Sequence, residues 1–162
     1  MAIETGDRLP EATFLEKGPA GIAAVPAGEV FGAKRVVLFG LPGAFTGMCS
    51  TQHVPSFIRV ADRLREKGVD AIVCVAVNDP HVMAAWSEAT GAGAAGIRML
   101  ADTDGGFTRA MGLEFSNPER GLLGRSRRYS LLAEDGVVRV LNLETSRTDC
   151  ELSGGETMLG QV

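Results

Sequence analysis

The order of secondary structure follows from one stretch, RVVLFGLPGAFTGMCS (residues 35–50), in which an apolar run ends at a turn containing proline and glycine. The run over residues 35–39 is short, β-branched and uninterrupted, which is typical of a central strand covered on both faces. Apolar residues then recur at helical spacing from Val54 to Leu64. The stretch therefore predicts a loop that joins a buried strand to an amphipathic helix.

Strand and helix patterns continue to alternate beyond this loop. The predicted elements are a strand over residues 71–77, a helix from Pro80 through Trp86 with its cap at Asn78-Asp79, a strand over 97–100 and a helix over 107–111. No repeat, low-complexity tract or linker divides the chain. We therefore expect one α/β domain over residues 1–162.

The C-terminal part carries a hairpin signal and a helix signal. Asp135-Gly136 separates two strand patterns, residues 128–133 and 137–142, and predicts an antiparallel pair. Ser153 and Glu156 have capping-box spacing before a last short helix. This order of elements matches a thioredoxin-like fold, with a central mixed β-sheet flanked by helices.

Charge and composition exclude several classes of partner. The net charge is −4, and the cations are scattered among acids, so no basic stripe for nucleic acid or an anionic membrane is present. We find neither a basic stretch followed by an apolar core at the N-terminus nor an apolar run long enough to span a bilayer. We expect a cytoplasmic protein that acts on a small molecule or another protein.

The three cysteines, Cys49, Cys74 and Cys150, are too few and too widely spaced for a secreted disulfide framework. The chain contains no C-x-x-C or H-x-x-x-H pair to nucleate a metal site, and no cofactor is expected. The cysteines therefore read as buried or reactive thiols.

Cys49 stands where a helix begins, next to unpaired backbone N–H groups and the positive end of the helix dipole. This position stabilises a thiolate, which could attack the O–O bond of a peroxide and become a sulfenic acid. Thr46 and backbone amides are local donors, Pro42 stiffens the loop, and Gly43 allows backbone to approach a ligand. From position alone, Cys49 could equally be a small core residue.

The stretch from Pro42 to Ser50, followed by His53 and Pro55, closely resembles the peroxiredoxin signature. Within that family, the residues of the motif resemble the type II or atypical two-cysteine (fifth) subfamily. Val77-Asn78-Asp79, Trp86, Leu100-Ala101-Asp102, Gly105, Phe107 and Arg128-Tyr129-Ser130 extend the resemblance over nearly the whole chain. The resemblance implies a thiol peroxidase for hydrogen peroxide and alkyl hydroperoxides. The sequence departs from the family's usual pattern at Gly47-Met48 and at His81, and these departures put the substrate preference in doubt.

By this resemblance Cys49 is the peroxidatic nucleophile, Thr46 bonds peroxide and thiolate, and Pro42 shields the site. Arg128 matches the arginine that binds both, and with Gly43 and Thr46 it contacts the substrate. Arg127 is its neighbour, and only one of two adjacent strand residues can face the pocket. We expect His53 to orient the helix start.

The thiol that completes the cycle is left open. Cys150 matches the resolving cysteine of animal atypical two-cysteine proteins and stands in a polar stretch, whereas Cys74 matches the spacing of the plant pair but lies within a predicted buried strand. An external donor, thioredoxin or glutaredoxin with glutathione, is the third source. Pro55 weakens the helix start, which would have to unwind for either disulfide. The resemblance also implies a homodimer.

Two alternatives share the helix-start cysteine. A thiol–disulfide oxidoreductase of thioredoxin type needs its second cysteine three positions after the first, where this chain has Gln52. A peroxide sensor would be oxidised once without turnover, and the sequence does not separate it from an enzyme.

Overall fold

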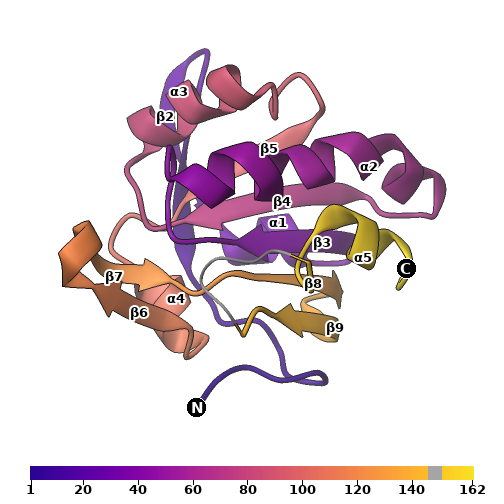
Figure 1. Ribbon diagram of the computed structural model, residues 1–162. Coiled ribbons are helices and arrows are strands. Elements are labelled where there is room, and N and C mark those ends of the chain that lie inside the picture. Colours follow the sequence, from indigo (N-terminus) through magenta and orange to yellow (C-terminus); the bar gives the residue numbers. More distant parts are fainter. Residues whose placement is uncertain (146–150) are drawn as a thin grey trace.

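The computed structural model describes residues 1–145 and 151–162, and its centre is a seven-stranded sheet in the order β2-β1-β5-β4-β3-β8-β9. The strands of this sheet are β1 (Thr13–Gly18), β2 (Gly21–Pro26), β3 (Arg35–Gly40), β4 (Ala71–Ala76), β5 (Ile97–Ala101), β8 (Tyr129–Glu134) and β9 (Val137–Leu143). A separate hairpin pairs β6 (Glu114–Asn117) with β7 (Leu122–Ser126). Figure 1 shows this hairpin projecting beside the sheet.

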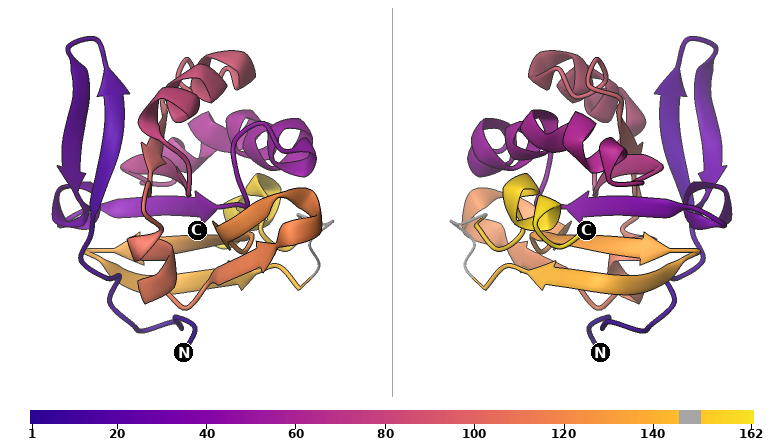
Figure 2. Two further views of the ribbon diagram at one scale, coloured as in Figure 1. Left: turned by 90° about the vertical axis from the view of Figure 1, so that its left-hand side faces the viewer. Right: turned by 90° about the vertical axis from the view of Figure 1, so that its right-hand side faces the viewer.

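Helices cover both faces of the sheet (Figures 1 and 2). The helical elements are α1 (Ala27–Phe31), the π-helical turn η1 (Cys49–His53), α2 (Val54–Glu66), α3 (Pro80–Thr90), α4 (Gly106–Ala110), the 3₁₀ turn η2 (Pro118–Arg120) and α5 (Gly155–Leu159). In the described part of the chain, no helix has the length and apolar character needed to cross a membrane.

The central strands separate two apolar cores because their side chains alternate between faces. Val37 and Phe39 of β3 pack with α2, α3 and α5, whereas Val36 and Leu38 pack with α1 and α4. Both sets are fully buried, as expected of parallel strands between helical layers. This confirms the buried strands predicted over residues 35–39 and 71–77.

The mixed sheet and its C-terminal hairpin are also confirmed. β3, β4 and β5 are parallel, and β8 is antiparallel to β3 and to β9. Asp135 and Gly136, which connect β8 to β9, both have positive φ, 49° and 76°, the geometry of a tight hairpin turn. The helix cap is confirmed at Asp79, whose carboxylate accepts a bond from the Val82 amide.

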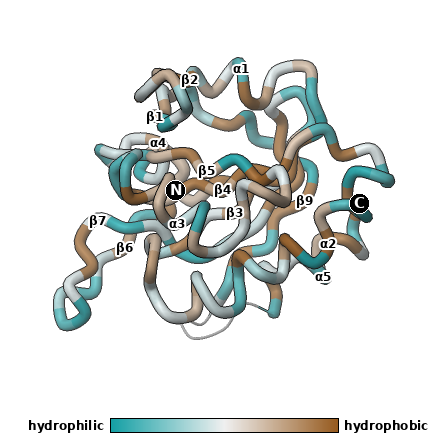
Figure 3. Tube along the Cα trace, turned by 90° about the horizontal axis from the view of Figure 1, so that it is seen from above, coloured by the Kyte–Doolittle hydropathy of each residue, from teal (hydrophilic) through white to brown (hydrophobic). Residues whose placement is uncertain are grey.

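Several features differ from the sequence prediction. The helix α1 and the β1–β2 and β6–β7 hairpins were not predicted, and the tip of the β6–β7 hairpin is hydrophilic (Figure 3). The capping box was wrong: α5 begins after Gly154, and the Ser153 hydroxyl instead donates to the carboxylate of Glu144 at 2.7 Å. The Glu144 carboxylate also accepts from the Ser153 amide at 2.9 Å, and such charge-assisted bonds are stronger than the bond between a hydroxyl oxygen and a backbone amide that a helix cap would make.

Candidate active site

Cys49 lies in the first helical turn after the carboxyl end of β3. The helical run begins at Gly47, and its first bond joins the Ser50 amide to the Thr46 carbonyl oxygen at 3.0 Å. The Val54 amide then reaches back five residues to the Cys49 carbonyl, which makes a π-helical turn, and Pro55 beyond it lacks an amide hydrogen. Pro55 predicted a weakened helix start, and the structure has a π-helical turn in place of regular α-helix at this point.

Arg128 directly contacts the sulfur of Cys49. Its Nη2 donates to Cys49 Sγ at 3.2 Å, and its side chain is 5% exposed. Tyr129 at the start of β8 pairs with Gly40 at the end of β3, so the residue before β8 lies beside the loop that carries Cys49. Arg128 therefore precedes the strand instead of belonging to it. Arg127 is half-exposed, and its amide donates to the Leu113 carbonyl.

His53 holds the other end of the Arg128 guanidinium. Arg128 Nη1 lies 2.9 Å from His53 Nδ1, and His53 Nε2 lies 3.0 Å from the Ser153 carbonyl oxygen. Because a guanidinium only donates, Nδ1 must accept, and the proton sits on Nε2. Burial, reinforced by the charge of Arg128, lowers the pKa of His53 from 6.5 to about 3. His53 is therefore a neutral support for Arg128 and not a base.

This buried histidine makes stability dependent on pH. The unfolded chain takes up a proton near pH 6.5 that the folded His53 refuses until about pH 3, so the free energy of unfolding falls as pH drops below 6.5. We expect a loss of about 2 kcal/mol between pH 7 and pH 5 from this group. Urea denaturation of wild type and His53→Gln at both pH values measures it.

The control for this prediction is His81→Gln, which removes an exposed imidazole and leaves His53 in place. His53→Gln should reduce the difference between pH 7 and pH 5, and His81→Gln should not. If the free energy of unfolding changes equally between pH 7 and pH 5 in wild type and in His53→Gln, then folding does not lower the pKa of His53.

Three polar contacts hold the loop before Cys49, and a fourth holds the residue after it. Thr46 Oγ1 donates to the Gly43 carbonyl oxygen at 2.7 Å, so its single proton is used within the loop and its lone pairs can accept from a peroxide O–H. Asn78 Oδ1 accepts from the Ala44 amide at 2.9 Å, and Arg125 Nη1 donates to the Pro42 carbonyl oxygen at 3.0 Å. The Ser50 hydroxyl accepts from the Trp86 indole at 2.9 Å.

Phe45, in the middle of this loop, has a φ of 62°. A left-handed conformation at a residue with a bulky side chain costs about 1–3 kcal/mol and persists only where the surroundings impose it. Its side chain is 56% exposed, so burial does not impose the conformation. The polar contacts at Pro42, Ala44 and Thr46 are the forces that hold it.

A cavity of about 230 Å³ adjoins the site. Its walls come from the loop over residues 41–46, called the active-site loop below, from the first helical residues after it, from the β6–β7 hairpin and from the residue before β8. They are Pro42, Thr46, Gly47, Met48, Phe115, Asn117, Arg120, Leu122 and Arg128. The cavity thus brings together the predicted Pro42, Thr46 and Arg128. The hairpin that the sequence did not predict supplies the opposite wall.

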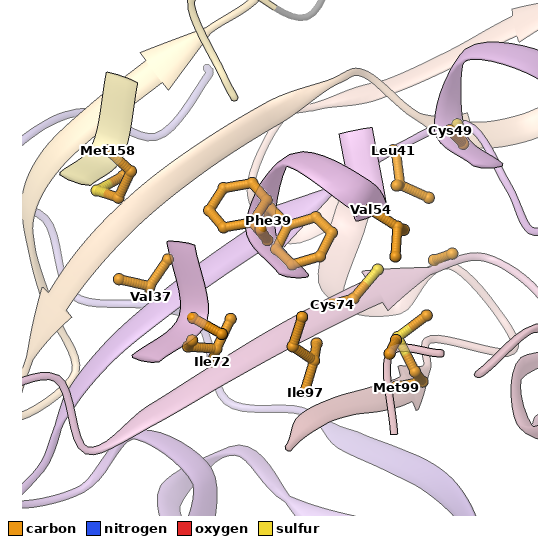
Figure 4. Packing of buried hydrophobic residues seen from close by; sticks show 14 of the residues in the cluster. Val37, Phe39, Leu41, Cys49, Val54, Ile72, Cys74, Ile97, Met99 and Met158 are labelled. Atoms are coloured by element: carbon orange, nitrogen blue, oxygen red, sulfur yellow. The ribbon is translucent and has the colours of Figure 1, made fainter. Parts of the chain in front are cut away.

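Cys74 lies in β4, fully buried among apolar side chains of the same cluster that contains Cys49 (Figure 4). Burial raises the pKa of the Cys74 thiol well above its ordinary value, and the nearby Cys49 adds to the effect. A thiol in this state is a poor nucleophile. Cys150 lies outside the described residues.

The sequence missed how the site residues are supported. Asn78 was predicted only as part of a helix cap, and nothing indicated that Arg125 reaches the Pro42 carbonyl. His53 was expected to orient the helix, and its contact with Arg128 was not foreseen. The only local signal was the clustering of three arginines within residues 125–128.

Comparison with known proteins identifies the family. The Redoxin family model matches residues 4–159. The chain is 50% identical over 146 residues to chloroplastic peroxiredoxin-2E-2 of Oryza sativa subsp. japonica, covering 88% of this chain and 65% of the relative, so it spans less than two thirds of that relative's length. It is 41% identical to mitochondrial peroxiredoxin-2F of Arabidopsis thaliana, covering 97% of this chain and 78% of the relative.

Solved structures give the same result. Reduced Prx3 of Vibrio vulnificus in complex with hydrogen peroxide superposes with a TM-score of 0.91, at 45% identity and with 98% of each chain covered. The relatives are named for the chloroplast and the mitochondrion, so the cytoplasmic location stays a prediction. The chain belongs to the redoxin family and, within it, to the type II peroxiredoxins, which are thiol-dependent peroxidases.

Proposed function

We propose that Cys49 is the peroxidatic thiolate and that Arg128 and Thr46 bind the peroxide. The thiolate attacks one peroxide oxygen, the O–O bond breaks, and the products are a Cys49 sulfenic acid and water or an alcohol once the leaving oxygen takes a proton. The observation that carries this is a free donor: Arg128 Nε is buried and has no hydrogen-bond partner among the described residues. A buried donor beside the sulfur can bind the oxygen on which charge develops.

The cavity supports organic hydroperoxides as substrates in addition to hydrogen peroxide. Met48, Phe115 and Leu122 give it apolar walls, and Thr46 and Arg128 line the same space. An alkyl group can therefore occupy the cavity while its hydroperoxide meets these two residues. The similar Prx3 of Vibrio vulnificus was solved with hydrogen peroxide, which supports the smaller substrate.

The experiment that tests this function is peroxide consumption with a small dithiol in excess. We expect many turnovers per protein molecule with both hydrogen peroxide and an alkyl hydroperoxide. Oxidation of one equivalent followed by no further consumption would instead indicate the sensor alternative.

For the second thiol we propose Cys150, with thioredoxin or glutaredoxin and glutathione as the donors that reduce the product. Glu151, the described residue after Cys150, lines a cavity together with Thr51 and Gln52, which follow Cys49 by two and three positions. Cys74 is disfavoured because its buried thiol holds its proton.

Mass spectrometry of the peroxide-treated protein, digested without reduction, identifies the partner of Cys49. We expect a Cys49–Cys150 link in wild type and an oxidised but unlinked Cys49 in Cys150→Ser. Cys74→Ala is the matched control and should retain the link. A Cys49–Cys74 link would contradict the assignment, and the absence of any internal link would leave an external thiol as the direct reductant.

The homodimer stays a proposal from the family resemblance. Phe45 on the active-site loop and Leu123 on the β6–β7 hairpin are large apolar side chains that are 56% and 66% exposed, so both are accessible to a second copy of the chain. Light scattering of the reduced protein measures its mass.

A further inference from the structure

Arg125 fastens the β6–β7 hairpin to the active-site loop. It lies in β7, is partly buried, and donates from Nη1 to the carbonyl oxygen of Pro42, 83 residues away in the sequence, at 3.0 Å. From a second direction Asn78 accepts from the Ala44 amide at 2.9 Å. These contacts fix the backbone on both sides of Gly43, three residues before Thr46.

Gly43 is shaped to admit this arginine. A Cβ built on Gly43 would overlap Arg125 Nη1, and it would also lie 3.4 Å from Asn78 Oδ1. Any side chain at position 43 would therefore displace the guanidinium from the Pro42 carbonyl. The absence of a side chain at Gly43 is therefore what allows Arg125 to reach the Pro42 carbonyl oxygen.

The contact bears on the chemistry because the loop continues directly into the site. Phe45 is held at a φ of 62°, and Thr46 donates to the Gly43 carbonyl oxygen, so a movement of Gly43 also moves Thr46. Cys49 and Arg128 are held separately, by the helix and by His53. Loss of the Arg125 contact should displace Pro42 and Thr46 relative to a sulfur whose own partner stays in place.

We propose that Arg125 is a positioning residue that sets the active-site loop, and Thr46 with it, at the distance from Cys49 that peroxide cleavage requires. The proposal rests on the function proposed above. It distinguishes Arg125 from Arg128: Arg128 contacts the sulfur and binds the peroxide itself, whereas Arg125 acts indirectly by placing Thr46. A displacement of reacting groups by about 1 Å is enough to slow a reaction by about a hundredfold.

The test is the rate constant for oxidation of Cys49 by hydrogen peroxide as a function of pH, measured in single turnovers. Arg125→Ala should lower the high-pH limit about tenfold and leave the pH midpoint unchanged, because the Arg128 contact with the sulfur remains. Arg127→Ala removes the same charge two residues away and should change neither quantity. Arg125→Met, which keeps the aliphatic volume, should lose the same factor and serves if the alanine variant does not fold.

Three outcomes would overturn the proposal. Folded Arg125 variants could keep the wild-type limit, which would make the contact structural only. The loss could be confined to a shift of the pH midpoint, which would make the effect one of charge. Arg127→Ala could lose the same factor. Wild type serves as the reference throughout, so a wild-type protein that does not react with peroxide refutes the proposed function, and equal rates in reactive proteins refute the role of Arg125.

Gly43→Ala gives an independent test of the same contact. In wild type it should lower the limiting rate about tenfold, and in the Arg125→Ala background it should lower it by no more than about threefold, because the overlapping guanidinium is already absent. The backbone cost of alanine at this position is present in both backgrounds and cancels. Equal factors in the two backgrounds would show that Arg125 does not act through Gly43.

Discussion

Cys49→Ser is expected to reduce peroxide turnover by at least about a thousandfold, because a serine hydroxyl remains protonated and is not activated by the groups around it. Arg128 can stabilise an anion on sulfur, and His53 is neutral with its Nδ1 already occupied by Arg128. No described side chain of the site is placed to take the proton of a serine. The measurement is steady-state consumption of hydrogen peroxide with a small dithiol as the reductant.

The matched control is Cys74→Ala. A small dithiol reduces the sulfenic acid directly, so no second protein thiol is needed and this variant should turn over at a rate close to wild type. Ordinary turnover by Cys49→Ser would end the assignment of Cys49. Loss of turnover in both variants, with both proteins folded, would show that turnover requires Cys74 as well as Cys49 and would contradict a cycle in which the dithiol reduces Cys49 directly.

The central elements could be predicted because their signals are local and strong. After Arg35, the run over residues 36–39 is apolar at every position, and the structure buries it on both faces. Asp135-Gly136 predicts its turn because both positions require positive φ, which these two residue types adopt most readily. The order of these elements was sufficient for the thioredoxin-like fold.

The hairpins that were missed lack such signals. In β2 most side chains are exposed although Ile22, Ala23 and Ala24 are apolar, so the alternation that marks a half-buried strand is absent. β6 has four residues and an irregular pairing with β7. Ser153 had the right spacing for a cap, but the carboxylate of Glu144 bonds it from nine residues upstream. A capping rule based on residue spacing takes no account of a carboxylate that approaches from another part of the chain.

In the candidate site, too, the residues of one local motif could be predicted, and the contacts between distant residues could not. Pro42, Thr46 and Cys49 lie within eight residues, so one contiguous motif names all three. Arg128 was chosen over Arg127 by the resemblance alone. The strand alternation that was expected to let only one of them face the pocket does not apply, because both residues precede β8. The support of Arg128 by His53 depends on a separation of 75 residues. Contacts of this range are set by the sheet order and not by local sequence.

Arg128→Ala is expected to lower the limiting rate of Cys49 oxidation about a hundredfold to a thousandfold. The substitution removes the donor at 3.2 Å from Sγ and also the unpartnered Nε–H proposed to bind the peroxide oxygen. Arg128→Lys keeps the charge but not the planar pair of donors, so it should recover only part of the lost limiting rate.

A second readout comes from His53, whose pKa is lowered first by burial and then by the charge of Arg128. In Arg128→Ala the burial remains and the charge is gone, so the pKa of His53 should rise from about 3, which NMR titration of the imidazole can follow. The two readouts separate the roles of this one side chain. A raised His53 pKa with unchanged oxidation kinetics would mean that Arg128 contacts the histidine without serving the sulfur, and the catalytic cation would then have to be Arg127 or another group.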